Sequence, residues 1–399
     1  MTKITFIGDI MCKEEMLKPA QRNGDYDFTN CFVHCRQLFA QSDAVIGNLE
    51  TPISINDEKL VCEKYSFNAP YEFGQAVYSA GINIVSTANN HCLDRGVEGI
   101  KSTVESLNKI GFLHTGIAKD KSEKPYLIID VNGMRLGILS YTYGTNADSN
   151  HVYIKKKDEW MVNLFQNQEN YNIVTRYCQQ HKSKVISKIY NKIWLILHPE
   201  LVAKSRCEIP QKSNHKKRRV IDTIHHLKSE EVDMMIMCLH IGGQYNTRPT
   251  RYTKDITAFL RKQGVDFVIC NHEHRVQSCD VSRLTDGKFT TYALGNFLGV
   301  GGTLQEPYDK LANYSIACHA YFSDEKLVQK ITFSVLKTIE EDNTVTTYPV
   351  YDLMNILDEP FEQYELWEET KKTVRTFSGM DISKTGFLQE YILYERVSE

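Results

Sequence analysis

The chain has 399 residues, 42% of them hydrophobic and 24% charged, which are the proportions of a folded soluble protein. This length exceeds what one small core needs, so we expect one large domain with additions, or two domains. With 47 Lys and Arg against 50 Asp and Glu, the formal net charge of −3 gives no global reason to expect a nucleic-acid partner.

The cysteines and the apolar runs predict where the protein works. The 11 cysteines lack the paired spacing of a zinc motif, and several lie within apolar runs. Such thiols behave as small buried hydrophobes and favour a reducing compartment over a disulfide framework. No apolar leader precedes residues 4–7, and no run is long enough to span a bilayer. We expect a cytoplasmic protein without a membrane segment, while the sequence indicates no oligomeric state.

Short β-branched runs alternate with longer amphipathic segments through residues 1–300, which predicts an α/β layered domain. Helices are expected from Tyr71 to Ala80 and from Gly96 to Ile110, each followed by a glycine suited to a left-handed C-cap. The expected strands are residues 4–7, 43–47, 82–87, 135–141, 232–239, 265–270 and 289–294.

The alternation breaks between about residues 147 and 219, which predicts a helical insertion. Two basic clusters, 155–157 and 216–219, bracket it. An insertion of this size often forms a lid or a partner surface. Two interpretations stay open: the insertion caps the site and turns Lys and Arg toward an anionic substrate, or the clusters are a solvated surface.

The last part of the chain has a different pattern. Alternating segments at 314–322, 328–336 and 344–350 predict antiparallel strands, and residues from Glu359 onward predict a helix followed by irregular structure. We therefore divide the chain into a main domain, residues 1–310, and a β-rich C-terminal extension, residues 311–399, that completes or covers the sheet.

Metal-ligating residue types recur where predicted strands end. Carboxylates, an amide and imidazoles are the ligands of hydrolytic divalent metals, which favours Mn, Fe or Zn at a site with an open position. Taken singly, Asp9 could cap a helix and His240 could be a satisfied core histidine. Alternation along an extended segment would place His272 and His274 on one side. The candidate ligands are Asp9, Glu50, Asn90, His240, His272 and His274.

His91 differs from the other histidines because it directly follows the candidate ligand Asn90. At that position it would lie beside a metal-bound substrate and could donate a proton to a leaving group. Asp94, three residues on, could orient the imidazole, act as a ligand, or serve as N-cap of the helix entering through Gly96.

These motifs together resemble those of CapA-type proteins, the bacterial capsule or poly-γ-glutamate synthesis proteins, whose domain is similar to calcineurin-like metallophosphoesterases. The resemblance covers roughly residues 3–300. In chain order, the motifs are IGDIM at 7–11, GNLETP at 47–52, ANNHCLDRG at 88–96, YTYGTN at 141–146, LHIGG at 239–243, HEH at 272–274 and ALGNF at 293–297.

The resemblance implies a four-layer α/β/β/α sandwich with a metal centre of two ions at the strand ends. Glu50 stands where the wider superfamily commonly has a bridging aspartate, His91 matches its proton donor, and Asn48 is a further candidate near the metals. By the same resemblance, Asp9 and His274 would hold one metal, and Asn90, His240 and His272 the other.

The chain also departs from the superfamily pattern. Met11 replaces a usual histidine, and Ile241 lies where capsule-type relatives favour tryptophan. Glu273, between the two histidines, occupies a place more often filled by proline. These departures indicate a site that binds one metal more weakly, or that takes an unusual substrate.

Three functions follow as hypotheses. The first is a metal-dependent hydrolase of a phosphoester or γ-glutamyl substrate, with His91 as general acid. The second is a capsule or poly-γ-glutamate biosynthesis component that binds the polymer or a phosphorylated intermediate without hydrolysing it. In both, the partner is an anionic small molecule or polymer. The third is a degenerate binding module, against which the joint presence of all six candidate ligands counts.

Overall fold

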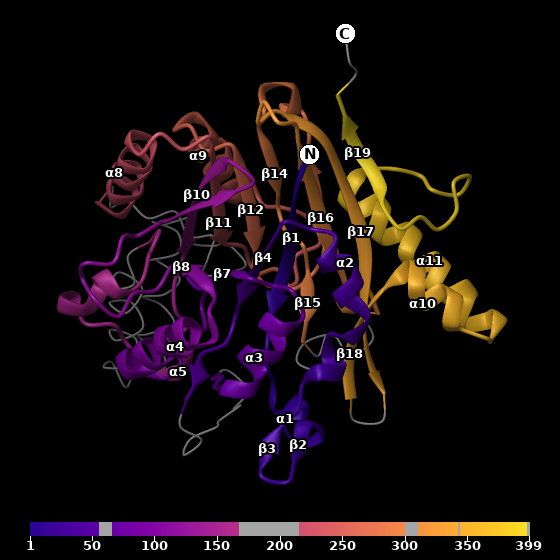
Figure 1. Ribbon diagram of the computed structural model, residues 1–399, viewed down its shortest axis with the longest axis horizontal. Coiled ribbons are helices and arrows are strands. Elements are labelled where there is room, and N and C mark those ends of the chain that lie inside the picture. The colour runs from indigo at the N-terminus through magenta and orange to yellow at the C-terminus, as the bar shows by residue number, and fades with distance from the viewer. Residues whose placement is uncertain (56–65, 167–214, 300–309, 342–343, 397–399) are drawn as a thin grey trace, which may run out of the picture.

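The computed structural model describes residues 1–55, 66–166, 215–299, 310–341 and 344–396. The chain folds as an α/β protein around two large β-sheets, with helices on their outer faces (Figure 1). Most of the predicted insertion, residues 167–214, lies outside the described residues. Among the described helices, none combines the length and apolar character needed to cross a membrane.

The first sheet has nine strands in the order β18-β17-β16-β1-β4-β7-β8, with β15 beside β1 and β19 beside β17. Strands β1, β4, β7, β8 and β15 run parallel, whereas β16 to β19 are antiparallel. The bounds are β1 (Thr2–Ile10), β4 (Ala44–Leu49), β7 (Ile84–Ser86), β8 (Leu113–Thr115), β15 (Asn296–Leu298), β16 (Tyr314–Phe322), β17 (Val328–Glu341), β18 (Thr344–Pro349) and β19 (Tyr391–Glu395).

The second sheet has six strands in the order β13-β14-β12-β11-β10-β9. Its four inner strands are parallel, and the edge strands β9 and β13 are antiparallel. The bounds are β9 (Leu127–Val131), β10 (Met134–Thr142), β11 (Met234–His240), β12 (Phe267–Asn271), β13 (Cys279–Asp280) and β14 (Phe289–Thr291). Two small sheets pair β2 (Gln21–Arg22) with β3 (Asp25–Tyr26) and β5 (Ile53–Ser54) with β6 (Ala69–Pro70).

The largest core cluster lies between the two sheets. Phe6 on β1 and Phe267 on β12 are fully buried, and their ring centroids are 6.1 Å apart. Complete burial of one such side chain contributes about 1.5–3 kcal/mol. Because strands alternate their side chains between faces, the residues next to these core positions face outward and need a second covering layer.

Helices supply that covering layer on each sheet. Phe73 and Val77 of α3 pack on the outer face of the first sheet, and Ile224 of α8 and Ile256 of α9 pack on that of the second. The helices are α1 (Glu14–Ala20), α2 (Arg36–Ala40), α3 (Tyr71–Ser79), α4 (Gly96–Ile110), α5 (Ala147–Asn150), α8 (His215–Ser229), α9 (Arg251–Lys262), α10 (Val350–Ile356) and α11 (Pro360–Ser378). Both helices predicted in the first part of the chain are confirmed as α3 and α4.

The strand predicted at 289–294 is wrong in its second half. β14 ends at Thr291 in the second sheet, and the chain then crosses to the first sheet to form β15. The crossing is tight: Gly295 has φ +79°, and a Cβ on Gly8 would lie 1.8 Å from the Gly295 carbonyl oxygen. Apolar alternation could not reveal this turn because it depends on how closely two backbones approach.

The C-terminal extension joins the first sheet. The antiparallel strands expected there are confirmed as β16, β17 and β18, and the helix expected after Glu359 is α11. Phe377 of α11 packs edge-on against Phe333 of β17, with centroids 5.0 Å apart. Residues 379–390 are irregular as predicted, but residues 391–395 form β19 against β17, a strand that the sequence analysis missed. So short a strand is stabilised by its neighbour rather than by its own pattern.

Two ends of the predicted insertion are described. Residues 147–166 contain α5 and a 3-10 helix, η4 (Lys156–Met161). Residues 216–219 belong to the first turns of α8, which packs on the second sheet through Val220 and Leu227. Lys216 is 4% exposed, and its Nζ lies 2.6 Å from Glu159 Oε2. At least one lysine of this basic cluster is therefore part of the packing between α8 and η4.

Candidate metal centre

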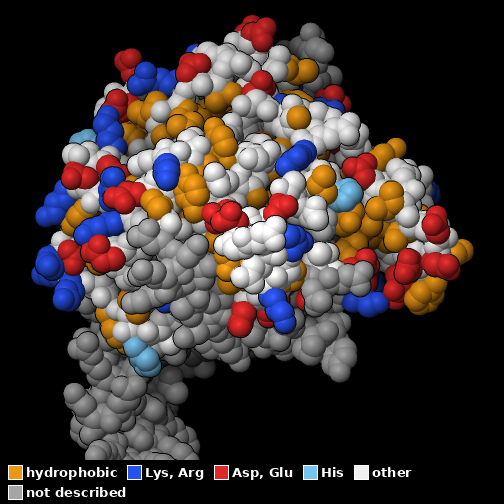
Figure 2. All heavy atoms as spheres, turned by 60° about the horizontal axis from the view of Figure 1, so that its bottom comes forward, with side chains coloured by type: hydrophobic (Ala, Val, Ile, Leu, Met, Phe, Trp, Pro, Cys, Tyr) orange, Lys and Arg blue, Asp and Glu red, His pale blue; other side chains and the backbone are white. Residues whose placement is uncertain are grey.

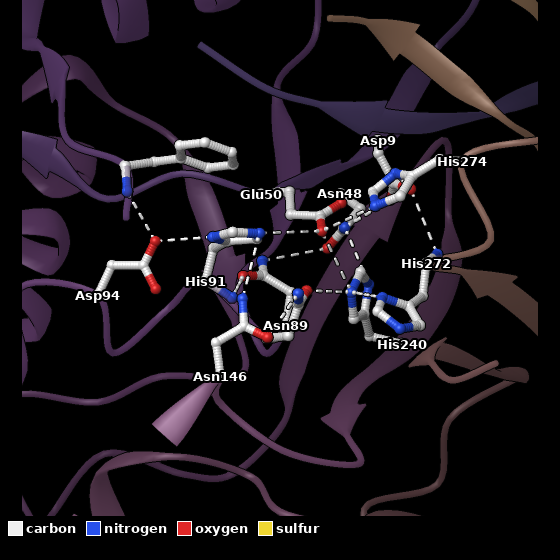
Figure 3. Close-up of polar contacts among 12 residues, drawn as sticks. Asp9, Asn48, Glu50, Asn89, His91, Asp94, Asn146, His240, His272 and His274 are labelled. Atoms are coloured by element: carbon white, nitrogen blue, oxygen red, sulfur yellow. Dashed lines mark hydrogen bonds and ion pairs between the residues drawn. The ribbon is translucent and has the colours of Figure 1, made fainter. Parts of the chain in front are cut away.

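The candidate ligands converge where strands of both sheets end (Figure 3). Asp9 lies on β1, His240 is the last residue of β11, and Glu50 follows β4. Because parallel strands in each sheet finish at this common edge, side chains far apart in sequence come into contact here. Asn48 Nδ2 joins them, donating to Asp9 Oδ1 at 2.7 Å and lying 3.2 Å from His240 Nδ1.

Glu50 is at the centre of this group and is fully buried. Its Oε1 lies 3.4 Å from His240 Nε2, 3.8 Å from His274 Nε2 and 4.0 Å from His91 Nε2. Within the described part of the chain, neither carboxylate oxygen has a hydrogen-bond partner. A buried carboxylate without hydrogen bonds is costly unless a cation compensates it.

One group of possible ligands consists of Asp9, Glu50 and His274, whose ligand atoms lie within 4.8 Å of one another. Asp9 Oδ2 is 3.4 Å from His274 Nδ1 and accepts a hydrogen bond from the His272 backbone N–H at 3.2 Å. Asn296 Oδ1 lies 2.9 Å from His274 Nδ1. The crossing through Gly295 therefore brings a further oxygen to this group.

A second group, Glu50, His240 and His272, meets the same 4.8 Å limit and shares Glu50 with the first. His240 Nε2 is 3.0 Å from His272 Nδ1 and 2.7 Å from Asn90 Oδ1. Two imidazole nitrogens and an amide oxygen thus point at nearly the same place. Nitrogen and oxygen donors of this kind suit Mn, Fe or Zn, and the residues fit a bound divalent ion.

Charges within the centre shift several pKa values. Burial alone would raise the pKa of Glu50, but the charges of His240 and His274 outweigh it and hold the pKa below its usual value. His274 shows the converse, because Glu50 and Asp9 overcome the effect of burial and raise its pKa to about 9. Burial and the neighbouring His240 and His274 lower the pKa of His272. A neutral His272 is the form that can ligate a metal.

His91 and Asp94 form a buried pair beside the centre (Figure 3). His91 Nδ1 lies 2.7 Å from Asp94 Oδ2, which also accepts from the backbone N–H of Phe67 at 2.8 Å. The Phe67 ring stacks on the imidazole with centroids 4.1 Å apart. Asp94 is not the N-cap of α4, a position taken by Arg95. The dyad instead fixes the ring so that Nε2 faces Glu50.

Sequence reasoning missed three side chains of the site. Asn146 and Asn296 belong to the motifs YTYGTN and ALGNF, but neither was predicted to have a role. Asn146 Nδ2 lies 3.3 Å from His91 Nε2, and Asn296 Oδ1 lies 2.9 Å from His274 Nδ1. No sequence signal marked Phe67, which lies just before β6 and stacks on His91 in the fold.

The explanation offered for the histidine pair was wrong, although both side chains do reach one centre. β12 ends at Asn271, and His272 and His274 have φ values of +108° and +53°. This is not an extended segment. Non-glycine residues held at positive φ cost about 1–3 kcal/mol each and concentrate at functional sites.

The face shown in Figure 2 has mixed charge. On the face shown in Figure 2, acidic and basic side chains of the described residues lie interspersed. Arg218 and Arg219, from the cluster at the start of α8, are exposed. The described residues on that face therefore present no broad basic field to an anion.

Comparisons with known proteins support the family resemblance. The family described as "Bacterial capsule synthesis protein PGA_cap" matches residues 3–300. "Capsule biosynthesis protein CapA" of Bacillus anthracis is 24% identical over 78% of this chain and 63% of its own length. "PGA biosynthesis protein CapA" of Bacillus subtilis is 21% identical over 78% of this chain and 67% of its own. The chain thus spans less than two thirds of the first of these relatives.

Proposed function

We propose, for a chain that belongs to the bacterial capsule synthesis family PGA_cap, that the buried centre makes it a metal-dependent hydrolase of a phosphoester or γ-glutamyl substrate. The two packed sheets and their outer helices would then be a metallophosphoesterase-type α/β/β/α sandwich. The expected ligands are Asp9, Glu50, Asn90, His240, His272 and His274, and the protein works on an anionic small molecule or polymer.

One observation carries the proposal. Glu50 is fully buried, lacks a hydrogen bond among the described residues, and belongs to both groups of possible ligands. A structural carboxylate at such a depth is normally satisfied by donors, as buried polar groups are in general. A carboxylate shared by two ligand groups supports two adjacent ions with Glu50 between them.

The residues next to the ligands supply the remaining chemistry. Divalent ions, when bound, would provide Lewis-acid polarisation of the scissile group. His91 Nε2 faces the centre while Asp94 holds Nδ1, so the imidazole can deliver a proton from Nε2 to a departing oxygen or nitrogen. Stacking on Phe67 keeps the ring in that orientation.

Metal content and turnover test the proposal together. The protein, purified without chelator and offered Mn²⁺ or Zn²⁺, should bind at least one ion, and the loaded protein should hydrolyse a phosphomonoester, a phosphodiester or a γ-glutamyl peptide. His240→Ala and His272→Ala should lower metal occupancy while the fold is kept, as judged by circular dichroism. If the wild type binds neither Mn²⁺ nor Zn²⁺, the proposal is contradicted.

A second function is favoured by the names of the relatives, which refer to biosynthesis. In that case the same centre would bind poly-γ-glutamate or a phosphorylated intermediate without cleaving it. Metal-dependent binding of poly-γ-glutamate with no release of glutamate or phosphate would favour this role over hydrolysis.

A further inference from the structure

The loop of residues 242–246 follows His240 and lies beside the metal centre. Gln244 and Tyr245 have φ values of +59° and +62°, which L side chains rarely adopt. The ring of Tyr245 reaches His274, with centroids 5.6 Å apart. A loop in this conformation needs compensating contacts, and Glu273 provides them.

Glu273 lies between two candidate ligands in sequence, yet its carboxylate points toward the loop. It is 1% exposed. Its Oε1 accepts from the backbone N–H of Gly243 at 3.0 Å and from Asn246 Nδ2 at 3.3 Å, and its Oε2 accepts from the backbone N–H of Asn246 at 3.1 Å. The Glu273 carbonyl oxygen accepts from the Tyr245 N–H at 2.8 Å. Charge-assisted bonds of this kind are the stronger ones.

Gly242 shows how closely the carboxylate is packed. Its φ is +141°, and a Cβ there would lie 2.4 Å from Glu273 Oε1. The loop therefore wraps around the carboxylate, and the contacts with Glu273 fix the backbone conformation at Tyr245.

Tyr245 has a side chain suited to contact with a ligand. It is half-buried, and among the described residues its hydroxyl forms no hydrogen bond. A tyrosine hydroxyl keeps its proton at neutral pH, because the ordinary pKa of a phenol is about 10. A protonated phenol beside a metal centre can donate a hydrogen bond to an anionic ligand, and it does not compete with that ligand for the metal.

We infer that Tyr245 contacts the substrate by donating a hydrogen bond to one of its anionic oxygens, and that Glu273 is the positioning residue that holds Tyr245 there. This inference rests on the proposed function and adds a residue that binds the anionic group of the substrate. Glu273 acts through the loop and is not itself a ligand of the centre.

The test uses full-length protein loaded with Mn²⁺ and inorganic phosphate as the probe, with both affinities measured by calorimetry. Tyr245→Phe should keep Mn²⁺ affinity and weaken phosphate binding about tenfold, the scale of a hydrogen bond to a charged group. For whichever p-nitrophenyl phosphate ester the wild type cleaves, KM should rise more than kcat falls. Tyr126→Phe is the matched control, because the Tyr126 hydroxyl that it removes donates to Glu230 on another part of the surface.

Glu273→Gln keeps the volume but turns one acceptor into an N–H₂ donor that faces the loop's own donors. It should weaken phosphate binding to a similar degree without releasing Mn²⁺, and the double variant with Tyr245→Phe should lose less than about threefold more, because the two residues act as one unit. A merely structural role would not produce this non-additivity.

The outcomes separate the two proposals. If the wild type binds Mn²⁺ and phosphate and Tyr245→Phe binds both equally well, the inference is wrong and the proposed function stands. If the wild type binds neither Mn²⁺ nor Zn²⁺, or if the loaded wild type turns over neither a phosphate ester nor a γ-glutamyl peptide, the proposed function fails and the inference with it. If the loaded wild type turns over a substrate but does not bind phosphate, the inference alone is wrong. Loss of Mn²⁺ in Tyr245→Phe, or additive losses in the double variant, would overturn the positioning role.

Discussion

The protein buries two polar clusters around histidines, and they differ in one respect. Around His319 every polar partner is satisfied: its Nδ1 lies 2.8 Å from Thr5 Oγ1 and its Nε2 lies 3.1 Å from Ser334 Oγ. Around Glu50, both carboxylate oxygens are left without hydrogen bonds within the described residues. The first cluster is satisfied by hydrogen bonds within the protein, whereas the second keeps two acceptor oxygens that a divalent ion could engage.

The His319 cluster also ties the C-terminal segment to the first sheet. Ser334 Oγ donates to the Gln389 carbonyl at 2.6 Å, and Lys3 Nζ donates to Glu390 Oε1 at 2.7 Å. Its role is therefore structural. Mutations around His319 should lower stability and spare activity, whereas mutations around Glu50 should lower metal binding or activity.

The largest expected effect is on turnover at His91. His91→Ala should keep most of the metal and lose turnover by about two to four orders of magnitude, the usual contribution of general acid catalysis. His114→Ala, which removes an imidazole bonded to Asn108 elsewhere, is the control and should keep its rate. The test measures kcat and the metal content of the purified variant. If His91→Ala purifies without metal, His91 is a ligand rather than a general acid.

The next effect concerns stability conferred by metal. At a Mn²⁺ concentration about 100 times its Kd, the unfolding free energy of the wild type should rise by about 2.7 kcal/mol, because the ion binds the folded state only. Glu50→Gln should lose most of this rise, and His319→Gln should keep it. Thermal unfolding with Mn²⁺ and with chelator measures both. An equal Mn²⁺-dependent rise in Glu50→Gln would remove the contrast between the clusters.

A pH effect is expected at His319. Burial lowers its pKa to about 3 from an ordinary value of 6.5. Between these values the unfolded chain binds a proton that the folded chain does not, so the stability falls as the pH drops through this window and returns as it rises. The contribution approaches about 1.4 kcal/mol per pH unit.

Urea unfolding of chelator-treated wild type and His319→Gln between pH 4.5 and 7 isolates this effect. The variant should be less stable at pH 7, and the gap should narrow toward acid, because glutamine does not titrate. Parallel stability curves for the two proteins would show that His319 does not carry the effect.

The smallest effect is expected at the exposed end of α8. Replacing Arg218 and Arg219 by Ala should change the unfolding free energy by no more than about 0.5 kcal/mol, as is usual at the surface. Lys216→Ala should cost more, since the Lys216 side chain is buried where it pairs with Glu159. A salt-sensitive rise in KM for the double Arg variant would instead support the interpretation that this cluster faces an anionic substrate.

Local pattern in the sequence was enough to predict the helices α3 and α4 and the central strands of both sheets. The helices at 71–80 and 96–110 follow from amphipathic spacing and the glycines behind them, and most strands follow from short β-branched runs. Candidate ligands were identifiable because each is a metal-ligating type placed where such a run ends. Neither inference needed knowledge of which strands would become neighbours.

Tertiary structure alone decided what depends on two distant segments meeting. The crossing at Gly295, the pairing of β19 with β17, the left-handed backbone at His272 and His274, and the stacking of Phe67 on His91 all arise from close approach between segments far apart in the chain. Glu273 shows the difference best. In the sequence it is a carboxylate between two histidines, and only the folded structure shows that it binds the loop of residues 242–246 rather than joining the candidate ligands. Sequence periodicity records which face of an element is buried, but the direction of a side chain at a strand end is fixed by the backbone that packs against it.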